Sequence, residues 1–159
     1  MTPPRRATHA DLPGLARLIN AAYRVEEFFL RGPRTTEPEL RDKLEAPEGA
    51  FLVIDGQAPG ELAGAVYVEL RGSRGYFGLL SVDPGRQGEG LARLLVNAAE
   101  AHCRAAGCVA LDIDVVNLRV ELPAFYAKFG FLPVSTAPFP TQDKLSQPAH
   151  LIVMSKPLA

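Results

Sequence analysis

GLLSVDPGRQGEGLARLLVNAAEAHC, residues 78–103, is the stretch that decides the fold. Residues 76–82 are mostly apolar, which predicts a strand, and the turn signal Asp-Pro-Gly follows at 83–85. Glycines at 88 and 90 then precede a long helical pattern. A glycine-bearing turn that opens a helix leaves backbone N–H groups unpaired at the positive end of the helix dipole. The stretch therefore predicts a phosphate-binding site.

The rest of the chain supplies helices and strands on both sides of this stretch. Helices are expected from Asp11 to near Tyr23, from Thr36 to Leu44 and at 122–129; strands are expected at 50–54, 62–70, 109–116, 131–135 and 151–155, with a weak edge strand at 3–8. The strand at 109–116 follows a helix, so it should run parallel to the strand at 76–82, whereas the three strands before that helix should be antiparallel. The predicted fold class is α+β, a mixed and mostly antiparallel central sheet of about seven strands flanked by about four helices, with a splayed parallel strand pair that leaves a crevice.

The long helix after Gly90 has an amphipathic pattern, which predicts which of its sides packs on the sheet. The expected packing face holds Leu91, Leu94, Leu95, Ala98, His102 and Ala105. The opposite face is polar and holds Arg93, Asn97, Glu100 and Arg104. Gly107 is expected to end the helix, because glycine readily adopts the left-handed conformation found just past many helix ends.

Length and composition indicate one soluble domain, residues 1–159. Hydrophobic residues make up 47% of the chain and the formal net charge is −1, which argues against nucleic-acid and membrane-surface binding. No apolar run is long enough to span a bilayer, and the first residues lack the apolar core of a signal peptide, so a cytoplasmic location is expected. Cys103 and Cys108 lack metal-ligand spacing, so we interpret them as reduced thiols and expect no metal site.

Three motifs occur in a set order along the second half of the chain. Gln87-x-x-Gly90-x-Ala92 follows the strand at 76–82, the strand at 111–116 ends in Asn117, and a segment at 125–131 reads Phe-Tyr-Ala-Lys-Phe-Gly-Phe. In this order and at this spacing, they resemble the GNAT superfamily of N-acetyltransferases. The resemblance covers nearly the whole chain.

The resemblance implies an acetyl-CoA-dependent N-acetyltransferase whose acceptor is a primary amine of a small molecule or peptide. The pyrophosphate of acetyl-CoA would be held by backbone amides of residues 87–92, and its pantetheine arm would pair with the edge of the strand at 76–82, as a peptide does in β-augmentation. The implied cofactor-binding residues are Leu80, Ser81, Val82, Gln87, Gly88, Glu89, Gly90, Leu91, Ala92, Asn117 and Tyr126. Homodimers are common among such proteins, so a homodimer remains open here.

The same resemblance implies that Tyr126 is the general acid for the coenzyme A thiolate. Many relatives carry a glutamate on the central strand as general base, but residues 76–80 contain no carboxylate. We favour Glu27 or Glu26 instead, because the family's acceptor pocket is lined by the segment between the first two helices. Glu69, Asp114 and His150 are further candidates.

Two other functions remain open at this point. Gly88-x-Gly90 followed by Asp112 also fits a dinucleotide site, although Arg93 occupies the third glycine position and the motif follows antiparallel strands. A protein that binds the coenzyme without turnover, as a sensor or partner module, is the second alternative. The missing strand carboxylate supports that alternative, and the presence of Tyr126 argues against it.

Overall fold

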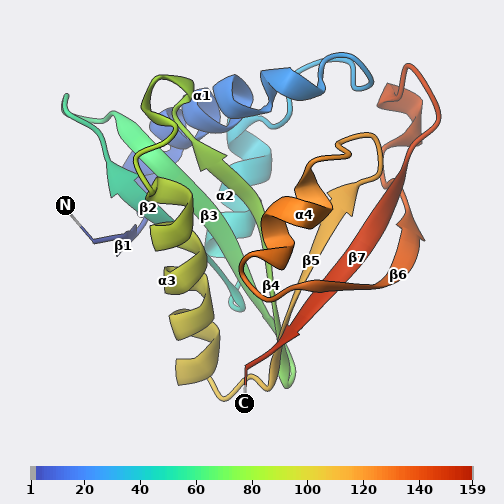
Figure 1. The fold of residues 1–159 in the computed structure, drawn as a ribbon. Coiled ribbons are helices and arrows are strands. Elements are labelled where there is room, and N and C mark those ends of the chain that lie inside the picture. Colours follow the sequence, from blue (N-terminus) through green and yellow to red (C-terminus); the bar gives the residue numbers. More distant parts are fainter. Residues whose placement is uncertain (1–2, 159) are drawn as a thin grey trace.

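The structure, a computed structural model, describes residues 3–158 and contains a mixed seven-stranded sheet in the order β1-β2-β3-β4-β5-β7-β6 (Figure 1). The strands are β1 (Arg5–Arg6), β2 (Gly49–Asp55), β3 (Leu62–Arg71), β4 (Arg74–Val82), β5 (Ala110–Val116), β6 (Leu132–Pro138) and β7 (His150–Pro157). The helices are α1 (Leu12–Ala22), α2 (Glu37–Glu45), α3 (Leu91–Ala105) and α4 (Leu122–Ala127). The predicted α+β fold class is confirmed. No helix within residues 3–158 combines the length and apolar character needed to cross a membrane.

Local sequence signals set the ends of the helices. Thr36 caps α2, because its hydroxyl accepts a hydrogen bond from the backbone N–H of Glu39. Proline lies in the first turn of both α1 and α2, where its missing N–H is not needed. These helices therefore begin within a residue or so of where the sequence places them, whereas α4 ends at Ala127, two residues before the expected end at Phe129.

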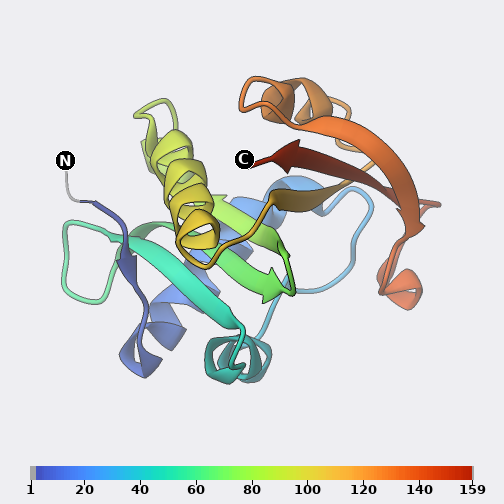
Figure 2. The same ribbon diagram turned by 90° about the horizontal axis from the view of Figure 1, so that it is seen from below.

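Helices cover both faces of the sheet, with α3 and α4 on one face and α1 and α2 on the other (Figure 2). Two hydrophobic cores result. The core under α3 and α4 includes Val66, Phe77, Leu95, Leu111, Phe131 and Met154. The core under α1 and α2 includes Leu15, Ile19, Leu40, Phe51 and Val53. Both sides of β3 are therefore buried, as expected for a central strand.

The parallel pair β4–β5 is hydrogen-bonded only at its beginning. Arg74, Gly75 and Tyr76 pair with Ala110, Leu111 and Asp112, and no pairs follow along the two strands. We call the point just after Tyr76 and Asp112 the fork. At its base the Arg74 guanidinium binds both carboxylate oxygens of Asp112, at 2.8 and 2.7 Å, and also the Ser155 hydroxyl of β7 at 2.9 Å. This cluster fixes where the strands begin to separate.

A bulge in β4 lies on the open side of the fork. The β3–β4 register shifts between Ala65 and Tyr67, so that β4 has one residue more than β3 in this interval. Leu79 has a φ of +54°, a left-handed conformation that is rare for a residue other than glycine. The bulge therefore lies at Leu79 and Leu80, beyond the last residue of β4 that pairs with β5.

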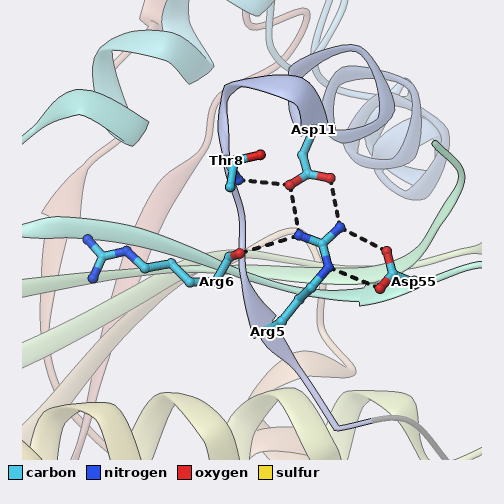
Figure 3. Close-up of polar contacts among 5 residues, drawn as sticks. All are labelled: Arg5, Arg6, Thr8, Asp11 and Asp55. Atoms are coloured by element: carbon cyan, nitrogen blue, oxygen red, sulfur yellow. Dashed lines mark hydrogen bonds and ion pairs between the residues drawn. The ribbon is translucent and has the colours of Figure 1, made fainter.

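An ion-pair cluster fastens β1 to the start of α1 (Figure 3). The Arg5 guanidinium donates to both oxygens of Asp11, at 2.9 and 3.0 Å, and to both oxygens of Asp55 on β2, at 2.8 and 3.0 Å. The backbone N–H of Thr8 donates to Asp11 as well. Hydrogen bonds from Arg5 keep the pKa of Asp11 below its ordinary value. The weak edge strand expected at 3–8 is thus a two-residue strand secured by charge.

The polar face expected for α3 is wrong in one respect. Glu100 is buried, and its charge is paired there. Lys156 at the end of β7 donates to one of its oxygens at 2.6 Å, and Arg104 donates to the other at 3.3 Å. The face that packs on the sheet is correspondingly rotated and includes Val96, Ala99 and Cys103 in addition to the expected Leu91 and Leu95. Buried glutamate side chains are rare unless they are paired in this way.

Candidate active site

A cavity of about 800 Å³ opens where β4 and β5 part. Its lining includes the glycine turn and first turn of α3, the free edge of β4 together with α4, the end of β5 and the loop after it, the loop after β6, and the segment between α1 and α2. The cavity therefore joins the predicted phosphate site to the predicted acceptor segment.

The glycine turn forms one end of the cavity, and its backbone is available to a ligand. Gly88 and Gly90 have φ values of +85° and +81°, and a Cβ added to either would meet no protein atom within 4 Å. Within residues 3–158, the backbone N–H groups from Gly88 to Ala92 donate to no acceptor outside the helix. These donors stand at the positive end of the 15-residue helix α3. The end of the cavity thus fits an anion such as a pyrophosphate.

The free edge of β4 forms the middle of the cavity. Leu80 and Val82 line it, as does Gly78. Ser81 lies on the opposite side of the strand, where it is buried and its hydroxyl donates to the carbonyl of Leu79. Because β5 has turned away, the polar backbone groups of this edge have no strand partner beyond Tyr76. An extended chain with amide groups is the type of ligand that such an edge accepts.

Tyr126 on α4 lies across the cavity from this edge. Its ring packs among Phe77, Phe125 and Phe131, with centroid distances of 6.0, 5.0 and 6.1 Å. Its hydroxyl makes no hydrogen bond within residues 3–158. Every fully buried polar side-chain atom in that range has a partner, so the Tyr126 hydroxyl is not fully buried and is open to the cavity that Tyr126 lines. Burial raises the pKa of Tyr126 well above its usual value. The phenol therefore stays protonated and is available to donate a hydrogen bond.

Glu26 brings a carboxylate to the other end of the cavity. It lies at the end of the short 3₁₀ helix that follows α1, and Arg119, from the loop between β5 and α4, donates to it at 3.1 Å. Burial raises the pKa of Glu26, an effect that the charges of Arg34 and Arg119 oppose. This ion pair joins two walls of the cavity. Nearby, burial raises the pKa of Tyr23 to about 12.

Asp114 on β5 is another carboxylate that lines the cavity. The Tyr76 hydroxyl donates to it at 3.4 Å. The Asp114 side chain is exposed to solvent in the open cavity, but the protein around it displaces part of its water and raises its pKa, while Tyr76 and two arginines, Arg71 and Arg34, counteract the shift. Asp114 forms no ion pair within residues 3–158.

Several residues predicted for the site lie outside the cavity. Glu27 is exposed and lines a separate pocket of about 390 Å³, and Glu89 is exposed and pairs with Arg86. The Asn117 carboxamide accepts a hydrogen bond from the backbone N–H of His150 at 2.8 Å, which ties β5 to β7. The other predicted residues, Glu26, Leu80, Val82, Gln87, Gly88, Gly90, Leu91, Ala92 and Tyr126, line the cavity.

This arrangement, a glycine turn and a splayed parallel strand pair with a tyrosine across from them, agrees with a sequence match. Residues 15–131 match the Acetyltransferase (GNAT) family. The chain belongs to this family. Its acetyl donor site is therefore expected where the GNAT motif from Gln87 to Ala92 meets the cavity.

Individual GNAT relatives cover different shares of the chain. Glucosamine 6-phosphate N-acetyltransferase 1 of Oryza sativa subsp. japonica is 36% identical over 112 residues, which are 63% of this chain and 66% of that protein. The mycothiol acetyltransferase of Propionibacterium freudenreichii subsp. shermanii is 36% identical over 132 residues, 79% of this chain but only 41% of that protein. The chain thus spans about two thirds and about two fifths of the length of these two relatives.

Solved GNAT structures share the fold. The ribosomal-protein-S18-alanine N-acetyltransferase from Escherichia coli matches with a TM-score of 0.77 at 19% identity, over 100% of this chain and 95% of that chain. At this identity the match establishes the fold alone.

Two features of this GNAT site carried no clear sequence signal. Arg119 and Glu26 are 93 positions apart in the chain, so no local sequence pattern predicts that they pair. The loop after β6 packs against the segment between α1 and α2, where Leu145 forms a β-bridge with Leu30 and Ser146 donates its backbone N–H to Phe29. This contact closes the cavity on the side where Leu30 lines it. Within residues 3–158, no cluster of three potential metal ligands occurs.

Proposed function

We propose that the protein transfers the acetyl group of acetyl-CoA to a primary amine of a small molecule or peptide. One observation carries the proposal: the unpaired amides after Gly88, the free edge of β4 and the Tyr126 hydroxyl all face one cavity that continues to a carboxylate-bearing end. Acetyl-CoA supplies an activated thioester, and a cavity of this shape would hold it with its carbonyl beside an amine.

Each part of the cavity has a role in this proposal. The N–H groups of residues 88–92 bind the pyrophosphate, and the edge of β4 binds the pantetheine arm. A backbone N–H near Leu80 polarises the thioester carbonyl. Tyr126 donates a hydrogen bond to the sulfur as it leaves, and the negative charge of Glu26 attracts the protonated amine to the far end.

The donor site is tested with a matched pair of glycine variants. Gly88 and Gly107 both have a φ of +85°, and a Cβ added to either would meet no protein atom within 4 Å, but Gly107 lies at the other end of α3. Valine at either position costs a similar backbone strain, about 1–2 kcal/mol. We expect Gly88→Val to raise the Kd of coenzyme A at least about tenfold, through contact between the new side chain and the pyrophosphate. Gly107→Val should leave that Kd unchanged in calorimetric titration, and equal losses would refute the assigned site.

The activity is tested by following thiol release from acetyl-CoA with a panel of alkylamines, amino acids and peptides with free N-termini. Amine-dependent release supports the acetyltransferase. The absence of a carboxylate from residues 76–80 of β4 favours a second candidate, a module that binds acetyl-CoA without turnover. Binding and thermal stabilisation by acetyl-CoA without thiol release from any amine would establish that second candidate instead.

A further inference from the structure

The central strand β4 carries no carboxylate, and the structure shows what occupies the corresponding space. Two residues beyond the last β4–β5 pair stand Gly78 on β4 and Asp114 on β5. A Cβ on Gly78 would lie 2.6 Å from the Tyr76 hydroxyl oxygen. The Tyr76 side chain therefore folds over Gly78 and directs its hydroxyl to Asp114, at 3.4 Å. A side chain at position 78 would have to displace the Tyr76 hydroxyl, so glycine leaves room for a phenol that is hydrogen-bonded to a carboxylate.

The other carboxylates in or near the cavity already accept hydrogen bonds from charged or hydroxyl side chains of the protein. Glu26 and Glu121 are both paired with Arg119, and Glu69 accepts from Arg71 at 2.6 Å and from Tyr67 at 2.8 Å. An arginine partner occupies carboxylate oxygens that would otherwise accept the amine proton, and this holds for Glu26 even though burial raises its pKa. Glu39 lies in the exposed first turn of α2, where Thr35 donates to it.

Asp114 faces few charges, and each is identified. From β4 comes the neutral Tyr76, from the end of β3 comes Arg71, and from the segment between the helices come Arg34 and, farther along the same wall, Tyr23. The residue opposite Asp114 on β7 is the apolar Val153. Arg71 lies over the Tyr76 ring at 4.0 Å from its centroid and is already bound to Glu69, so it is not an ion-pair partner of Asp114.

From this geometry we propose that Asp114 is the general base for the acceptor amine, with Tyr76 as its positioning partner. The inference rests on the proposed acetyltransferase function. The protonated amine gives one proton to Asp114, which later releases it to solvent. The nitrogen lone pair then forms the C–N bond to the acetyl carbonyl carbon while the C–S bond breaks. The second nitrogen proton ends on the sulfur, which Tyr126 holds by a hydrogen bond, so the products are the amide, free coenzyme A and one proton.

The first test compares the pH dependence of kcat/KM for wild type and Asp114→Asn, with acetyl-CoA and the best amine of the panel. We expect a loss of at least about 100-fold at neutral pH, within the usual range for general-base catalysis. The acidic limb of the wild-type profile should disappear, and the variant's rate should keep rising toward the pKa of the amine itself. The control Asp42→Asn, on an exposed residue of α2, should retain the wild-type profile.

A second readout does not depend on turnover. Carboxyl-carbon NMR of ¹³C-aspartate-labelled protein, assigned with Asp114→Asn, should show Asp114 titrating above the ordinary aspartate value of about 3.9. Tyr76→Phe should raise that pKa further, because it removes a hydrogen bond that stabilises the carboxylate.

The outcomes separate this inference from the function on which it rests. If wild type releases thiol with an amine but Asp114→Asn keeps the acidic limb, or if Glu26→Gln abolishes that limb instead, the assignment of Asp114 is overturned and the acetyltransferase stands. An Asp114 that titrates at or below the ordinary aspartate value also overturns the assignment. Absence of thiol release from wild type with every amine refutes both.

Discussion

Replacing Tyr126 by phenylalanine removes one oxygen atom and leaves the ring in place. The ring contacts with Phe77, Phe125 and Phe131 should persist, and within residues 3–158 the hydroxyl has no hydrogen-bond partner to lose. We therefore expect the free energy of unfolding to change by less than about 0.5 kcal/mol, which is a shift in Tm of roughly 1–2 °C.

The effect on acetyl transfer should be much larger. A thiol titrates near 8.5 and a free phenol near 10, and burial raises the pKa of Tyr126 further, so full proton transfer from the phenol to the thiolate is uphill. The remaining contribution is a hydrogen bond to a charged sulfur, worth about 1.5–3 kcal/mol. Its loss should lower kcat by roughly 10- to 150-fold.

The assay is steady-state thiol release, with the Kd of coenzyme A measured by calorimetry on the same preparations. Tyr126→Phe should lower kcat and leave the Kd nearly unchanged, whereas Tyr126→Leu, which also removes ring packing, should lower Tm as well. If Tyr126→Phe weakens coenzyme binding as much as it slows turnover, Tyr126 is a packing residue and the reasoning fails.

Two ion pairs give further predictions. Arg119→Met leaves Glu26 buried without a partner, so it should cost about 2 kcal/mol at neutral pH, roughly 4–8 °C in Tm. The folded-state pKa of Glu26 is raised, so its ionisation opposes folding above about pH 4.3, and the loss should shrink as the pH falls through the raised folded-state value toward about 4.3 in thermal unfolding experiments. Arg5→Gln should cost about 1 kcal/mol, because the 41% exposure of Arg5 weakens its pairs. The folded-state pKa of Asp11 is depressed, so this stability is present above about pH 3.9 and is lost as the pH falls through the folded value.

For each ion-pair prediction, one measured outcome would contradict the reasoning. A deficit for Arg119→Met that is the same at about pH 7 and about pH 4 would mean that the charge of Glu26 is not the cause. A deficit for Arg5→Gln that persists unchanged at about pH 3 would mean that Arg5 acts by packing rather than by pairing with Asp11 and Asp55.

The parts of the fold that follow from local chemistry were predictable. Thr36 with its cap, the prolines in the first turns and the glycines before α3 act within a few residues, and they placed the helices. The parallel step at β4–β5 followed from the helix between the two strands, because a right-handed crossover returns the chain parallel to its start.

Features that depend on distant partners were not predictable. The sequence pattern assigned Glu100 to the polar face, because no residue near it indicates that its partner is Lys156, 56 positions later. The left-handed Leu79 has no sequence signal, since leucine ordinarily avoids that conformation. At the site, the short helix after α1 directs Glu26 inward and leaves Glu27 outside, a difference of one position that helical periodicity in a segment of four residues does not settle.

The cluster of Arg74, Asp112 and Ser155 has a consequence for how such a protein changes its substrates. β4 and β5 pair at three positions and then diverge, and this cluster holds the two strands together where they pair. A substitution in the cluster should change the gap between β4 and β5 for donor and acceptor together. A substitution near the far end of one strand should affect only one of the two. Evolution or engineering can thus change the acceptor specificity through the loops at the far ends of the strands, while binding of the common acetyl donor is preserved.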